Sequence, residues 1–106
     1  MRAGSLDRII RLQRETEVGD DGAGNPITEW NDFATLRAQR IEASTAEFIR
    51  DWGTEAERLF IFRARFVDGV STYDRLVFED ESYNIVEMKE LGRREGLEFR
   101  CTRRGS

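Results

Sequence analysis

The chain has 106 residues, of which 39% are hydrophobic and 36% charged, a composition typical of one globular domain with a strongly charged surface. Its 17 basic and 21 acidic residues give a net charge of −4, which argues against a dedicated nucleic-acid-binding protein. With no histidine and a single cysteine, it lacks the usual acid–base catalyst and any internal disulfide. We therefore expect one non-enzymatic domain over residues 1–106, without metal or cofactor.

The first predicted element is a β-strand over residues 6–15. It has one mainly apolar side, because alternate positions fall on the same parity: Leu6, Arg8, Ile10, Leu12 and Arg14. The segment before it lacks the apolar run of a signal peptide, and no stretch approaches the ~18 apolar residues of a membrane span. The sequence therefore predicts neither targeting nor membrane insertion.

Next comes a segment, Thr16 to Ile27, with three glycines, two aspartates and the only proline. A tight hairpin needs only about two to five loop residues, so this segment predicts an oversized loop, and such loops are usually functional or disordered. It lacks the ligand spacing of a calcium loop, and Gly22 and Gly24 form a bare G-x-G without the further glycine and following helix of a phosphate-binding loop. We predict a mobile hairpin arm that contacts another subunit, with these interface candidates: Val18, Gly19, Asp20, Asp21, Gly22, Gly24, Asn25 and Pro26.

An extended pattern resumes at residues 27–30, breaks at 31–35 and continues as a strand over residues 36–44. Trp30 directly follows the arm, and tryptophan is among the residue types that are enriched at interface hot spots. Trp30 is therefore a further interface candidate, with a place in the core as the alternative.

A short helix is predicted after this strand, because Ser44 and Glu47 form a capping box. Its apolar stripe follows helical spacing: Thr45, Phe48, Ile49 and Trp52. Two turns cannot stand alone, so the stripe must pack on the next strand or on a neighbouring subunit. Phe48 and Trp52 complete the list of interface candidates.

The strongest predicted strand covers residues 57–67. One face is assigned to the core: Phe60, Phe62, Ala64 and Phe66. On the other face Leu59 and Ile61 predict a covered half, whereas Arg63 and Arg65 predict a solvated half.

The remaining chain predicts a hairpin of residues 75–79 and 83–88, a turn at 92–96 and a last strand over 97–102. In that strand one parity is expected inside, namely Leu97, Phe99 and Cys101, and the other outside, namely Glu98, Arg100 and Thr102. About six short strands and one helix make a mainly β fold, a small antiparallel barrel or sandwich.

Three arginines on the predicted outer faces, Arg63, Arg65 and Arg100, offer an alternative function as a single-stranded nucleic-acid-binding barrel. Acidic residues interleave the basic ones, and most aromatic residues have core parity. A solvated face with cross-strand ion pairs is therefore favoured over phosphate contacts, and a subunit interface is the third option.

An ordered series of residues runs through nearly the whole chain: Ala3, Gly4, Leu6, Arg8, Ile9, Leu12, Gln13, Arg14, Gly24, Trp30, Ala38, Ser44, Glu47, Arg63, Arg75, Leu76, Tyr83, Asn84 and Ile85. In order, spacing and length this series resembles the phage head-tail joining proteins, also called head-tail adaptor or head-closure (stopper) proteins. Two positions depart from the family pattern: Arg37 stands where a Trp is common, and residues 79–82 replace an Asp-Gly turn. These departures leave the subfamily open.

The resemblance implies a β-barrel with a short helix and no catalytic residues. It also implies a homo-oligomeric ring, often dodecameric, between the portal or adaptor ring and the tail proteins of a phage, prophage or phage-derived particle. Such rings assemble in the bacterial host cytoplasm, can be monomeric when isolated, and join the DNA-filled head to the tail. They can also close the DNA channel. An acidic ring suits this role, because walls of like charge let DNA pass without binding it specifically.

Overall fold

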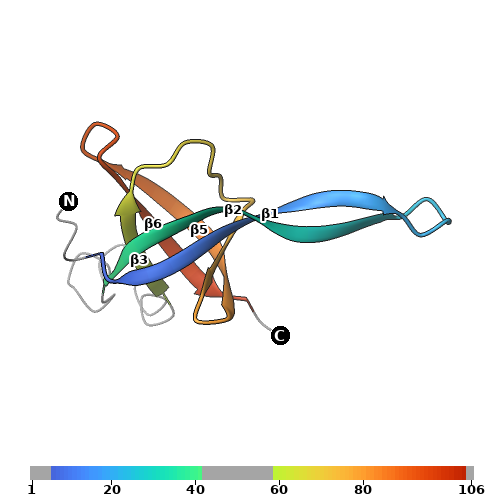
Figure 1. Ribbon diagram of the computed structural model, residues 1–106, viewed down its shortest axis with the longest axis horizontal. Helices are drawn as coiled ribbons and strands as arrows, with labels where there is room; N and C mark the ends of the chain where they lie inside the picture. Colours follow the sequence, from blue (N-terminus) through green and yellow to red (C-terminus); the bar gives the residue numbers. More distant parts are fainter. Residues whose placement is uncertain (1–5, 42–58, 105–106) are drawn as a thin grey trace.

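The computed structural model describes residues 6–41 and 59–104, and these residues form six antiparallel strands. The strands are β1 (Arg8–Asp20), β2 (Pro26–Ile41), β3 (Leu59–Arg65), β4 (Arg75–Phe78), β5 (Glu81–Leu91) and β6 (Gly96–Arg103). They close into a barrel in the order β1-β2-β3-β6-β5-β4, with β4 pairing back onto residues 11–13 of β1 (Figure 1). The predicted mainly β, antiparallel fold is confirmed, whereas the predicted helix with Phe48 and Trp52 lies outside the described residues.

The barrel interior is filled by the side chains of alternate strand positions. Phe62 and Phe99 are fully buried on neighbouring strands, and Phe62 packs against Phe78 with ring centroids 5.0 Å apart. Leu97 and Cys101 are buried beside Phe99, as their parity predicts. Two expected core residues, Phe60 and Phe66, are only partly buried, although both pack against the same cluster.

The outer face of β3 and β6 is covered more extensively than the sequence predicts. Leu59 and Ile61 are buried, as expected, but so are Glu98 and Arg100, which were predicted to face solvent and are only 1% and 4% exposed. Ion pairs make this burial tolerable, because a buried charge needs a charged, hydrogen-bonded partner. The prediction of cross-strand ion pairs is thus confirmed, and the prediction of a solvated face is wrong at these two positions.

The β4–β5 hairpin is tighter than predicted. Its turn consists of Glu79 and Asp80, with φ angles of 51° and 63°, while Glu81 and Ser82 already belong to β5. Two consecutive left-handed residues are the geometry of a type I′ turn, which matches the right-handed twist of the flanking strands. This geometry allows the two-residue connection without an Asp-Gly pair.

The first hairpin differs most from the prediction. Thr16 to Ile27 is not an oversized loop, because β1 and β2 remain paired beyond the barrel and only residues 21–25 form the loop. The expected break at residues 31–35 is absent, since β2 runs through it. The molecule consequently measures 51 × 31 × 25 Å, and Figure 1 shows the ribbon projecting along the longest axis.

Candidate functional site

We use "the arm" for residues 15–30, the part of the first hairpin that projects from the barrel. Beyond Gln13, β1 pairs with β2 and with no other described strand, so both outer edges of the ribbon lack a neighbour. Every arm side chain is exposed except that of Trp30, which is half-buried. Val18 and Ile27 expose 54% and 47% of their area. Unpaired strand edges with apolar side chains are a surface on which another chain can pack.

The arm is purely acidic. It contains no lysine or arginine and five carboxylates: Glu15, Glu17, Asp20, Asp21 and Glu29. Since the whole chain has 17 basic and 21 acidic residues, the rest of it has 16 acidic residues and a charge of +1. The negative charge of the protein is therefore concentrated on the arm.

Hydrogen bonds within the loop shape the tip of the arm. The Asp21 carboxylate accepts hydrogen bonds from the backbone N–H of Ala23 at 2.8 Å and from the side-chain amide of Asn25 at 2.9 Å. Asp20 accepts one from the backbone N–H of Gly22 at 2.9 Å. The side-chain amide of Asn25 and the backbone N–H groups of Ala23 and Asn25 hold the pKa of Asp21 below its ordinary value, so this carboxylate stays ionised. Whether the arm is mobile stays a prediction.

A β-bulge marks the point where the arm leaves the barrel. Leu12 pairs with Ala34, but Gln13 pairs with Asp32, so Phe33 is an extra residue on β2. A bulge bends its strand and increases the local twist. Here it separates the part of the hairpin that belongs to the barrel from the part that projects.

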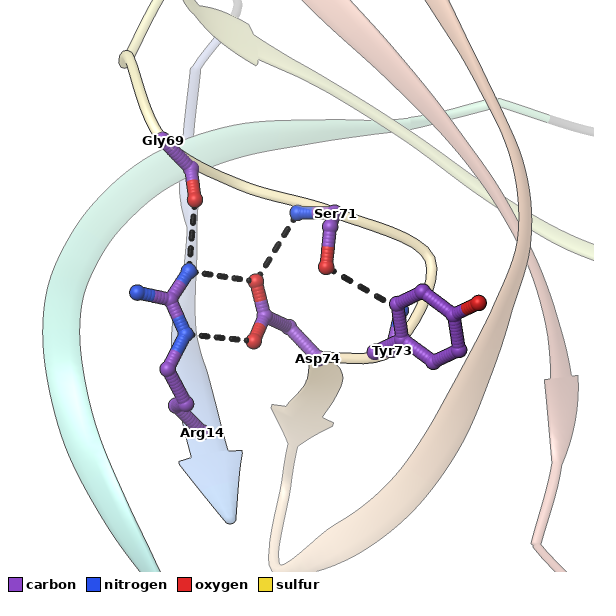
Figure 2. Close-up of polar contacts among 5 residues, drawn as sticks. All are labelled: Arg14, Gly69, Ser71, Tyr73 and Asp74. Carbon is purple, nitrogen blue, oxygen red and sulfur yellow. Dashed lines mark hydrogen bonds and ion pairs between the residues drawn. The ribbon is translucent and has the colours of Figure 1, made fainter. Parts of the chain in front are cut away.

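A bidentate ion pair ties the root of the arm to the loop of residues 66–74 (Figure 2). Arg14 Nε and one terminal nitrogen each lie 2.9 Å from a carboxylate oxygen of Asp74, and Arg14 also donates to the carbonyl of Gly69. Asp74 is 3% exposed and accepts a further hydrogen bond from the Ser71 N–H. Burial alone would raise the pKa of Asp74, but the bonds from Arg14 and Ser71 outweigh it and keep the pKa low.

Beside this ion pair, two guanidinium groups lie over the Trp30 ring, Arg75 at 4.4 Å and Arg104 at 5.0 Å from its centroid. Gln13 accepts a hydrogen bond from Arg75 at 2.7 Å and donates one to Asp32 at 2.6 Å. Burial lowers the pKa of Arg75, and the neighbouring positive charge of Arg104 lowers it further. Arg75 and Arg104 therefore lie close together at the root of the arm, with the carboxylates of Asp32 and Glu15 near Arg75.

These groups border an open cleft of about 580 Å³, which we call the root cleft. It is lined by Arg14, Glu15, Trp30, Ser71, Tyr73, Asp74 and Arg104. Trp30 is the interface candidate that the structure places here, whereas Tyr73 and Arg104 escaped the sequence prediction. Tyr73 is 90% exposed in a loop, where no strand parity exists to single it out. The only indication in the sequence is that an aromatic residue lies between two predicted strands.

The arginines of the alternative nucleic-acid face lie on neighbouring strands, but two of them are held by carboxylates. Arg63 Nε lies 2.8 Å from Glu98, and the 4%-exposed Arg100 bridges Glu98 at 2.9 Å and Glu87 at 2.8 Å. Arg65 is exposed at the end of β3. Because the guanidinium of Arg100 is both buried and paired with carboxylates, this surface is poorly suited to binding phosphates.

The described residues also bear on catalysis and metal binding. Cys101 is fully buried, and burial raises the pKa of its thiol to about 12, so it behaves as a small hydrophobic residue. Within residues 6–41 and 59–104, no cluster of acidic, cysteine or histidine side chains is arranged to hold a metal ion. Nor does this part of the chain contain a helix long and apolar enough to span a membrane.

A sequence model of the phage head completion protein family matches residues 1–104. The chain belongs to this family. Membership gives it a structural role connected with the phage head. The resemblance to phage head-tail joining proteins that was inferred from the residue series agrees with this assignment.

Solved structures share the fold of this head completion protein. The solution structure of protein SF1141 from Shigella flexneri 2a is similar with a TM-score of 0.77 and 21% identity, covering 97% of this chain and 96% of the other. A chain of the virion of a native gene transfer agent particle is similar with a TM-score of 0.60 and 17% identity, covering 90% and 91%. A comparison with curated protein sequences found no match.

Proposed function

We propose that this head completion protein is a ring subunit of the connector that joins the DNA-filled head to the tail. The observation that carries the proposal is the arm, a two-stranded ribbon with one register shift at Val18 that contributes no residue to the buried core. A segment that the barrel does not need for its own packing is available for contacts with another chain. Its exposed Val18 and Ile27 would be covered by such a contact.

The proposed neighbours are other copies in the ring, the portal or adaptor ring, and tail proteins. The ring would be dodecameric in the particle, which assembles in the host cytoplasm, and the isolated subunit would be monomeric. We propose a non-enzymatic role without cofactor, consistent with the buried, unreactive Cys101 and the absence of histidine. Closure of the DNA channel is part of the same proposal.

The charge distribution supports passage of DNA without specific binding. The arm carries five carboxylates and no basic residue, so it repels the phosphate backbone. On the barrel, Arg63 and Arg100 are occupied by Glu98 and Glu87. A surface of this kind can line or surround a channel without retaining the DNA inside it.

Shortening the arm tests the proposal. Replacing residues 17–28 by Asn-Gly would keep the Thr16–Glu29 pair and close it with a favoured two-residue turn. We expect the free energy of unfolding to change by less than about 1 kcal/mol, because an exposed ribbon buries little surface. Filled heads without tails should accumulate in electron micrographs of the particle. A matched control, Ala23→Ser at the exposed tip, should join heads to tails normally.

Normal joining by a stably folded short-arm variant would overturn the proposed role of the arm. An unfolded variant would instead contradict the claim that the barrel does not need the arm, and chemical denaturation distinguishes the two results. A less drastic variant, Val18→Ser with Ile27→Ser, repeats the test without shortening the ribbon. It should fold normally and reduce joining.

A further inference from the structure

We propose that the acidic arm tip of one copy docks into the root cleft of a second copy of this chain. The proposal deepens the ring function above and rests on it: it names which two surfaces of the subunit meet. One surface is the tip with Asp20 and Asp21, and the other is the cleft bordered by Trp30, Tyr73 and Arg104.

The first argument is charge complementarity within the same chain. The arm has five carboxylates and no basic side chain, whereas the rest of the chain is slightly positive. At the root cleft, Arg104 donates a hydrogen bond to the neutral amide oxygen of Asn84 at 2.9 Å and lies over Trp30. An arginine held by a neutral amide and an aromatic ring can donate hydrogen bonds to a carboxylate of another chain. Within the cleft Arg14 is paired with Asp74, and Glu15 also lines it, so Arg104 is the basic group that a tip carboxylate would meet. A tip carboxylate paired with Arg104 would favour the association and set its orientation.

The second argument is the chemistry of the root cleft. Tyr73 exposes 90% of its area beside the half-buried Trp30, and tyrosine, tryptophan and arginine dominate the energetics of protein interfaces. The loop that carries Tyr73 is fixed by the buried Asp74, which bonds both Ser71 and Arg14 (Figure 2). The cleft is therefore preorganised, which lowers the entropic cost of binding.

The third argument is geometric. The arm points away from its own root, so its tip lies at the far end of the long axis of the molecule (Figure 1). Paired strands up to Asp20 and Pro26 prevent the tip from folding back onto the same chain. The occupant must then be another molecule, and the contact joins two different surfaces of one chain. Such a heterologous contact closes into a ring when the rotation between copies allows it.

Disulfide trapping in assembled particles tests the contact directly. A chain with Asp20→Cys and Tyr73→Cys, produced as a mixture of isotope-labelled and unlabelled protein, would be oxidised, digested and analysed by mass spectrometry. The native thiol of Cys101 is buried and should not compete. We expect tip and cleft peptides linked between labelled and unlabelled chains, and a ladder of covalent oligomers on a non-reducing gel.

The control variant carries Asp20→Cys with Arg93→Cys in the exposed β5–β6 turn, and it should give no ladder. Linkage within one chain, linkage only between two tips, or capture of the tip by a portal or tail protein would each overturn the docking. If particles with the short arm still fail to join while no tip–cleft linkage forms, the docking falls and the connector function stands. If the short arm joins normally, the proposed role of the arm in joining falls whatever the linkage.

A charge exchange provides the second measurement. Asp20→Lys should reduce joining at least tenfold, and adding Arg104→Glu should restore most of it, because the pair is then reversed. The backbone N–H of Arg104 bonds the carbonyl of Ser82, a contact that the substitution keeps. Arg93→Glu, which makes the same charge change in the distant turn, should not rescue. Equal rescue by Arg104→Glu and Arg93→Glu would overturn the docking, and so would the absence of rescue by either change.

Discussion

The barrel and the arm use the same kind of backbone for opposite purposes. In the barrel, alternate residues of six strands fill one interior, and Phe62, Leu12 and Phe99 are fully buried. In the arm, two strands also pair, with one register shift at Val18, but they enclose nothing, and the side chains are exposed on both faces. Regular pairing therefore does not require a core, provided that the ribbon is rooted in a structure that has one.

The two regions also differ in how their charged residues are paired. On the barrel, Glu98 lies between Arg63 and Arg100, and burial forces these three charges to pair. On the arm, Glu17 and Asp20 are exposed and no arginine lies within the ribbon to balance them. Paired charges on the barrel contribute to stability, whereas like charges on the arm determine which surfaces it can approach.

The largest expected difference between the regions is the cost of removing an apolar side chain. Phe62→Ala should lower the free energy of unfolding by about 3–5 kcal/mol, because it leaves a cavity in a closed interior. Val18→Ala on the arm should cost less than about 0.5 kcal/mol, because this side chain is already exposed. Urea denaturation of both variants measures the difference. Similar losses would show that the arm is part of the cooperative core.

The next largest effect concerns the buried ion pairs. Glu98→Gln keeps the volume but removes the charge that pairs with Arg63 and Arg100, and it should cost about 2–3 kcal/mol. The control Glu87→Gln removes a carboxylate that is 47% exposed, so its loss should remain below about 1 kcal/mol. Equal losses in denaturation would indicate that Glu98 is solvated in solution.

Acid should lower the stability of the barrel through Glu98. Burial raises the pKa of Glu98, but the hydrogen bonds and charges of Arg63 and Arg100 outweigh burial and hold the pKa below its ordinary 4.5. Unfolding then takes up a proton, so the stability from Glu98 is present above pH 4.5 and is lost as the pH falls through the lowered pKa. Stability curves between pH 6 and about pH 2 should be flatter for Glu98→Gln. An unchanged slope would contradict the lowered pKa.

A smaller effect is expected at the junction of the two regions. Asp74→Asn removes the carboxylate that holds Arg14, and should cost about 1 kcal/mol while the barrel remains folded. Spin labels at Ala23→Cys and Arg93→Cys would report the arm direction by pulsed dipolar spectroscopy. In the Asp74→Asn variant we expect a broader distribution of distances between the two spin labels than in the parent protein. The control Asp68→Asn should show no broadening. Identical distributions would show that the bulge alone directs the arm.

The smallest expected effect tests the alternative nucleic-acid function. At physiological salt the protein should bind single- and double-stranded DNA only weakly, and Arg65→Glu should change that binding less than twofold. Arg65 is the exposed member of a set whose other two arginines pair with carboxylates. Fluorescence anisotropy over a salt series is the measurement. Tight binding with a steep salt dependence, lost in Arg65→Glu, would replace the connector proposal by nucleic-acid binding.

The sequence alone determined the strand faces of the barrel. Ile10 and Leu12 on β1, Phe62 and Ala64 on β3, and Leu97, Phe99 and Cys101 on β6 all lie in the buried cluster at alternate positions, although the intervening residues of β6 are buried as well. The family resemblance was equally accessible from sequence, because it depends on the order of residues and not on their contacts. The family match over residues 1–104 agrees with it.

Tertiary structure alone decided three features: the paired strands of the arm, the burial of Glu98 and Arg100, and the root cleft. The arm was predicted as a loop because its glycines and aspartates disfavour strands, but cross-strand hydrogen bonds rooted in the barrel override that local preference. Glu98 and Arg100 were predicted outside by parity, yet parity gives the side of a strand and not whether that side is covered. The root cleft joins β1, β2, a loop and the end of β6, segments far apart in the sequence. Only closure of the barrel brings them together.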